Sequence, residues 1–184
     1  MTRHFTNSLR FLCVTLAVLL AINCAGCLRG GGNEKIIPQE ERYIDAKLGF
    51  SVIHPQTWER AMIPVSSPDF SKDSINWHIP ASGSTGTMLI KVYPALRSAT
   101  ELPILLDQIL EENADYSRGK IEDFNHPAGN ALATTLSSGT NQKRLFVIDG
   151  IHSAYILSFE VVSEEFEKNS SLFERISESL RELP

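Results

Sequence analysis

The stretch that decides the fold is residues 143–162, KRLFVIDGIHSAYILSFEVV. Two runs rich in β-branched and aromatic residues flank Asp149-Gly150, and an Asp-Gly pair between such runs is the strongest short-range signal for a β-hairpin. The pattern predicts antiparallel strands over residues 143–148 and 152–162. An antiparallel sheet is therefore the expected centre of the fold.

Further strands are predicted on the N-terminal side of this hairpin. Residues 42–45 and 50–54 form a second hairpin through residues 46–49, where Gly49 is available for a positive φ. Trp58, shortly after the second strand, is expected in the core. The remaining segments with strand-like composition are 60–65 and 74–79, which are weak, and 87–93, 120–124 and 130–136.

Two helices complete the pattern. Thr100 is the expected N-cap of the first, whose apolar residues recur at three- and four-residue spacings: Leu102, Leu105, Leu106, Ile109 and Leu110. Ser171-x-x-Glu174 resembles a capping box and predicts a second helix that ends the chain. Strands and helices in this order indicate an α+β domain, an antiparallel β-sheet with helices rather than a βαβ fold.

The N-terminal stretch has the pattern of a secretory signal. Arg3 and Arg10 precede an apolar run over residues 11–22, small residues precede Cys27, and no acidic residue occurs before Glu34. A signal anchor is the competing interpretation, but twelve apolar residues fall short of the roughly 20 that span a bilayer. The pattern resembles a bacterial lipoprotein signal, so we expect residues 1–26 to be removed and Cys27 to be lipidated. Cleavage before Cys24 fits this pattern less well, because Asn23 would then precede the cut.

Residues 27–41 are expected to be a flexible tether because glycines and polar residues follow Cys27. Residues 42–184 are then a single α+β domain. Of the three cysteines, Cys13 and Cys24 would leave with the signal and Cys27 would carry lipid, so no thiol would remain for a disulfide, a metal or a nucleophile. By the same resemblance, an aspartate directly after the lipidated cysteine would hold a lipoprotein in the inner membrane. Leu28 stands at that position here, which favours the outer membrane.

The charge balance bears on the partners. Removing Arg3 and Arg10 lowers the number of Lys and Arg residues from 17 to 15 against 22 Asp and Glu, which gives a net charge of −7. An acidic chain with scattered positive charges lacks the basic stripe that nucleic acid requires. Membrane attachment is therefore expected through the lipid on Cys27, and the other partner is expected to be an envelope protein or a lipid ligand.

The start and the end of the domain resemble the PsbP-like family. Tyr43-Ile44-Asp45, then Gly49-Phe50-Ser51, Pro55 and Trp58, is similar to the opening of that family, which includes the extrinsic P subunit of photosystem II and DcrB-like bacterial lipoproteins. A hairpin with a central Gly over residues 146–159, a turn with Phe166 and a final helix with Phe173 are similar to its close.

The resemblance implies an antiparallel sheet sandwiched by helices, used mostly in non-catalytic accessory, assembly or binding roles. It supplies no catalytic residue, cofactor or metal ligand to this sequence. Residues 60–86 depart from the family pattern, which makes this the region where a function peculiar to this protein would lie; the sequence does not decide whether it forms a binding site.

Candidate catalytic groups are few. His54, His78, His126 and His152 have no histidine or cysteine partner at metal-ligand spacing, and residues 82–87 (SGSTGT) lack the motifs of a phosphate loop or a hydrolase. The first hypothesis is therefore a non-enzymatic, lipid-anchored binding or assembly module of the cell envelope. The alternative is a periplasmic, hydrolase-like enzyme whose site assembles from His54, His78 and a carboxylate.

Overall fold

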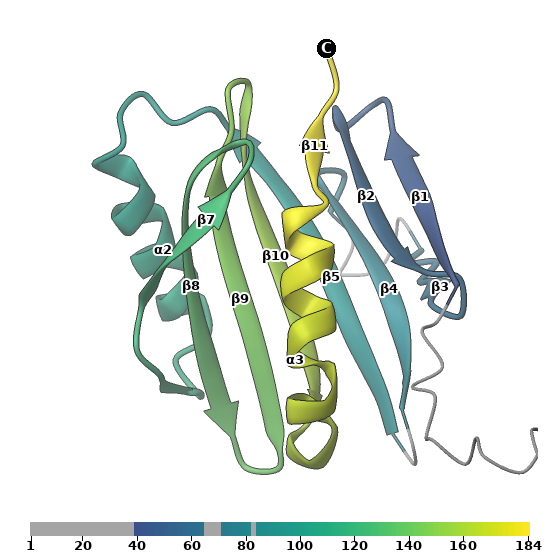
Figure 1. Cartoon of the computed structure of the whole chain (residues 1–184). Coiled ribbons are helices and arrows are strands. Elements are labelled where there is room, and N and C mark those ends of the chain that lie inside the picture. The colour runs from purple at the N-terminus through teal and green to yellow at the C-terminus, as the bar shows by residue number, and fades with distance from the viewer. Residues whose placement is uncertain (1–38, 65–70, 82–83) are drawn as a thin grey trace, which may run out of the picture. The chain divides into compact units, whose positions relative to one another are not determined.

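The predicted central hairpin lies inside an eight-stranded antiparallel sheet (Figure 1). The computed structural model describes residues 39–64, 71–81 and 84–184. The strand order is β3-β4-β5-β10-β9-β8-β6, with β7 paired to β8. The bounds are β3 Glu59–Arg60, β4 Ser74–Ala81, β5 Ser84–Pro94, β6 Ser117–Arg118, β7 Glu122–His126, β8 Gly129–Ser138, β9 Asn141–Asp149 and β10 Ser153–Val162.

A small second sheet has the order β1-β2-β11, with β1 Glu40–Asp45, β2 Phe50–Pro55 and β11 Arg181–Glu182. The predicted hairpin between β1 and β2 is confirmed, and Gly49 has a φ of 73° in its turn. The start of β1 is tied to the domain twice. Gln39 accepts a backbone hydrogen bond from Gln56, and Arg175 Nε donates to Glu40 at 3.0 Å. Glu40 and Glu41 thus lie in β1, within the range expected for the tether.

One face of the large sheet is covered by helix α3 (Ser163–Glu178) and the small sheet. Phe159, at 0% exposure, stacks on Phe173 of α3 with ring centroids 4.7 Å apart. Phe50 of β2 contacts Tyr155 of β10 edge to face. We call this side the α3 face. It also buries Trp58, as predicted.

Helix α2 (Glu101–Glu112) lies on the opposite face, and all five residues of its predicted apolar stripe are buried. They pack on side chains of β8, β9 and β10, namely Leu136, Leu145, Val147, Ala154 and Ile156. The sheet is therefore sandwiched between helices, as expected. Thr100 makes no capping bond, because its hydroxyl pairs with that of Ser98 at 2.7 Å.

Several local predictions are wrong. Helix α3 begins at Ser163 rather than near Ser171, so the Ser-x-x-Glu motif lies inside the helix and Phe166 is not in a turn. The helix ends at Glu178, and β11 follows it. In the weak segment 60–65, only Arg60 belongs to a strand; residues 61–64 are irregular, and Val65 lies outside the described residues.

The turn between β9 and β10 is built around a carboxylate from β11. Glu182 accepts backbone hydrogen bonds from Ile151, His152 and Ser153 at 2.7–3.0 Å, and one from the Tyr155 hydroxyl at 3.1 Å. A Cβ on Gly150 would lie 2.7 Å from the backbone carbonyl oxygen of Ser153 and 2.7 Å from Glu182 Oε1, so glycine is required here by space. Gly150 has no positive φ, unlike the glycine of a type I′ turn.

Candidate binding groove

Alternation along the strands gives the two faces of the large sheet different chemistry. On β10, Tyr155, Leu157 and Phe159 point into the core of the α3 face. Ser158 and Glu160, between and beyond them, point to the face that carries α2 and are partly exposed. The same switch occurs on β4, where buried Trp77 is flanked by polar residues. A polar strip therefore runs across β4, β5 and β10 on the α2 side.

Helix α2 leaves this strip open. Its apolar cluster reaches Ile156 of β10 and Tyr93 of β5. The part of the sheet face formed by β4, by β5 around Thr87 and Leu89, and by the end of β10 therefore lies beyond the helix. Among the described residues, the segment that covers this strip is residues 61–64, which follow β3. Ala61 donates its N–H to Asn76 of β4 at 2.8 Å, and residues 61–64 then leave the sheet. Met62 is 89% exposed.

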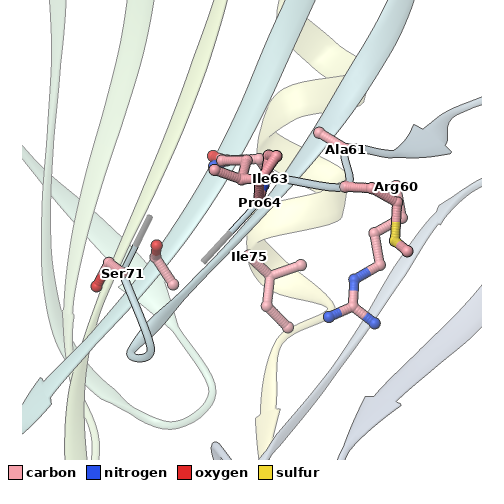
Figure 2. A pocket seen from close by; sticks show the side chains of 9 residues that line it. Arg60, Ala61, Ile63, Pro64, Ser71 and Ile75 are labelled. Atoms are coloured by element: carbon pink, nitrogen blue, oxygen red, sulfur yellow. The ribbon is translucent and has the colours of Figure 1, made fainter. Parts of the chain in front are cut away.

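A groove of about 470 Å³ lies between residues 61–64 and the strip, and we call it the β4–β10 groove. Its lining residues are Ala61, Met62, Ile63, Pro64, Asn76, Trp77, His78, Thr87, Leu89, Lys143, Ser158 and Glu160. Figure 2 shows a second hollow, of about 420 Å³, beside the same segment. Arg60, Ser71 and Ile75 contribute to that one. Both volumes fall in the range of about 300–1,000 Å³ typical of small-molecule sites.

The end of the β4–β10 groove is formed by a network of charged and polar groups. Lys143 Nζ donates to Asn113 Oδ1 at 2.7 Å and lies 3.4 Å from Glu160 Oε2. Glu160 Oε1 accepts from the Tyr116 hydroxyl at 2.6 Å and from Asn141 at 3.2 Å. Burial, together with the bond to Glu160, raises the pKa of Tyr116 to about 12, so this hydroxyl remains a donor at neutral pH.

The structure separates the two histidines of the enzyme hypothesis. His54 is buried against Trp77, with ring centroids 5.6 Å apart, on the α3 face of β4. His78 follows Trp77 directly in β4, so its side chain points to the opposite face of the sheet and lines the β4–β10 groove. The two side chains do not converge on one site.

The other predicted candidates are apart as well. His126 is buried at the end of β7, where it accepts from the Ala128 N–H and its Nε2 donates to the Ser177 carbonyl of α3. His152 lies exposed in the turn held by Glu182. Ser82 and Gly83 of the SGSTGT segment, and Cys27, lie outside the described residues.

Neither a metal cluster nor a membrane-spanning helix is found in the part of the chain that the structure describes. No group of three or more His, Cys, Asp or Glu side chains there is arranged to hold a metal ion. No helix within residues 39–64, 71–81 and 84–184 is long and apolar enough to cross a bilayer.

Comparison with solved structures identifies the class of fold. Cyanobacterial PsbP (CyanoP) from Synechocystis sp. PCC 6803 is similar over 84% of this chain and 98% of its own, with a TM-score of 0.58 and 12% identity. LpqN, involved in cell envelope biogenesis of Mycobacterium tuberculosis, is similar over 79% and 91%, with a TM-score of 0.53 and 13% identity. A mutant of protein Mog1 is similar over 79% of this chain and 96% of its own, with a TM-score of 0.51 and 5% identity.

These similarities show that the protein has a PsbP-like fold, which confirms the family resemblance of its sequence at the level of the fold. No protein-family model matches the chain, and no curated protein matches it in sequence.

The network at the end of the groove was not predicted from the sequence. Ser158 and Glu160 interrupt an otherwise apolar strand, and that interruption was the available signal. The partners Asn113 and Tyr116 follow α2 in a segment without periodicity, so no pattern connects them to β10. Residues 61–64 belong to the region that departs from the family pattern, and they line both hollows.

Proposed function

We propose that this protein is a lipid-anchored, non-catalytic binding module of the cell envelope, and that the β4–β10 groove is its binding site. The observation that carries the proposal is the half-covered sheet face. Residues 61–64 and 76–78 of its lining lie in the segment that departs from the PsbP-like pattern. The charged residues Lys143 and Glu160 of the groove pair with each other. An accessory role in the envelope is also supported by the similar fold of LpqN.

The anchor is proposed at Cys27, where the sequence resembles a lipoprotein signal. Two or more acyl chains would give stable attachment, whereas a single chain gives only marginal binding. Leu28 supports placement in the outer membrane. Changing Cys27 to Ser should abolish labelling with radioactive palmitate and leave an unprocessed precursor. A processed Cys27→Ser protein that stays with the membrane would contradict the anchor.

The binding role is tested by crosslinking in cells. A photoreactive amino acid is placed at Met62, at the rim of the groove, and at Glu174, which is exposed on α3 of the opposite face. We expect a discrete crosslinked product from position 62 only. Equal products from both positions, or none from position 62, would contradict binding through this groove.

A further inference from the structure

The floor of the β4–β10 groove consists largely of side chains that form hydrogen bonds without carrying charge. Asn76 of β4, Thr87 of β5 and Ser158 of β10 line it. Thr87 lies opposite His78 on one side and Glu160 on the other, so these side chains form a row across three strands. An amide and hydroxyls act both as donors and as acceptors. The floor therefore suits a ligand that is rich in hydrogen-bonding groups of both kinds.

The charged residues at the end of the groove leave one acceptor open. Glu160 Oε1 already accepts from Tyr116 and Asn141, whereas Oε2 has a single long contact with Lys143 at 3.4 Å. The carboxylate side chain is 27% exposed. Because the ammonium of Lys143 lies beside Oε2, it repels a cationic ligand and favours a neutral donor such as a hydroxyl.

Residues 61–64 provide an apolar wall opposite this polar floor. Met62, Ile63 and Pro64 contribute, and Leu89 adds an apolar patch to the floor. A purely apolar acyl chain does not match this groove, because it would cover the hydroxyls and the amide without replacing their hydrogen bonds to water. A ligand that combines hydroxyl groups with a C–H surface matches both walls.

We infer that the β4–β10 groove binds a neutral saccharide of one or two rings. The hydroxyls would bond to Asn76 and Ser158, which lie on either side of Leu89, to Thr87 in the neighbouring row and to Glu160 Oε2. The C–H face of a ring would pack under residues 61–64. This inference rests on the proposed function, since it names the ligand class of the same groove. The volume of about 470 Å³ lies within the range for such ligands.

The test is an NMR titration of the full-length protein, purified in a detergent without a sugar headgroup. Maltose and the disaccharide of N-acetylglucosamine are the probes. We expect saturable shifts of the backbone amides of Thr87 and Ser158 with at least one probe. The double variant Thr87→Val/Ser158→Ala should bind about tenfold or more weakly, because each lost hydrogen bond weakens binding several-fold. Ser170→Ala, on α3 of the other face, is the matched control and should bind like the parent.

Three outcomes would overturn the inference. The first is the absence of shifts in β5 and β10 with either sugar up to its solubility limit. The second is equal binding by the double variant and the parent. The third is that palmitate, rather than a sugar, shifts these amides. Failure here is distinguishable from failure of the proposed function, because a crosslink from position 62 can still occur when neither sugar binds.

Discussion

The two faces of the eight-stranded sheet are covered in different ways. The α3 face is closed by a helix and a second sheet, and aromatic rings fill the space between them. The opposite face is closed by α2 over β8, β9, half of β10 and the Tyr93 end of β5, and beyond Ile156 it is an open groove with a largely polar floor. The same strands thus contribute apolar residues to one side and hydrogen-bonding residues to the other. Stability is concentrated on the closed side, and the proposed binding site uses the open side.

The largest expected effect on stability comes from substituting, one at a time, two adjacent residues of β10 that face opposite sides of the sheet. Phe159→Ala should lower the free energy of unfolding by about 3–5 kcal/mol, because it leaves a cavity against Phe173. Ser158→Ala, one residue away and facing the groove, should change it by less than about 1 kcal/mol. Chemical denaturation of both variants measures the difference. Equal losses would contradict the contrast between the faces.

The Glu182 latch, by which we mean the Glu182 carboxylate with its hydrogen bonds to the β9–β10 turn and to Tyr155, ties β11 to the large sheet on the α3 face. Removing its charge should have the next largest effect on stability. Burial alone would raise its pKa, but hydrogen bonds from His152, Ile151, Tyr155 and Ser153 outweigh burial and lower the pKa. Glu182→Gln should cost about 1–2 kcal/mol at neutral pH, since it weakens charge-assisted hydrogen bonds.

The pH dependence of the latch has a defined sign. A lowered pKa means that the carboxylate stabilises the fold above its ordinary value of 4.5 and loses this contribution as the pH falls through its folded value. The difference in the free energy of unfolding between the parent and Glu182→Gln should therefore disappear in acid. Glu111→Gln, at an exposed position of α2, is the control and should show no such difference at any pH. A gap that persists in acid would assign the effect of Glu182→Gln to packing.

On the open face, Tyr116→Phe removes the donor to Glu160 and should cost about 0.5–1.5 kcal/mol. Tyr93→Phe is a matched control, because the Tyr93 hydroxyl is buried without a hydrogen-bond partner in the described structure. Its removal should be neutral or slightly stabilising. Thermal denaturation compares the two variants. If both lose the same stability, the bond to Glu160 contributes nothing specific.

The smallest expected effect is a pH slope from His126, which joins β7 to α3 on the closed side. Burial lowers its pKa below the ordinary value of 6.5 and outweighs the opposing bond to the Ser177 carbonyl. Unfolding therefore takes up protons, and stability should fall as the pH drops from about 6.5 toward the folded pKa. The slope should be smaller in His126→Gln, as measured by denaturation across this range. Identical slopes would refute the assignment.

Much of the fold was predictable because its signals are local. The alternation in β9 and β10 and the stripe of α2 each place residues on one face without reference to the rest of the chain. The start of α3 was missed because residues 163–171 contain one apolar side chain, Phe166, which is buried by tertiary contacts. The groove itself was not predicted; the sequence indicated only that residues 60–86 depart from the family pattern. The irregular cover at residues 61–64 has no periodicity, and the floor comes from strands far apart in the sequence.

The position of Glu40 has a mechanical consequence. A pull on the chain that precedes the domain reaches Gln39 and Glu40 first. Gln39 is bonded to Gln56 beyond β2, and Glu40 is held by Arg175 near the end of α3. Tension is therefore shared with the helix that closes the core before it can peel β1 from β2. Detaching the edge strand under load would require breaking this ion pair as well as the backbone ladder.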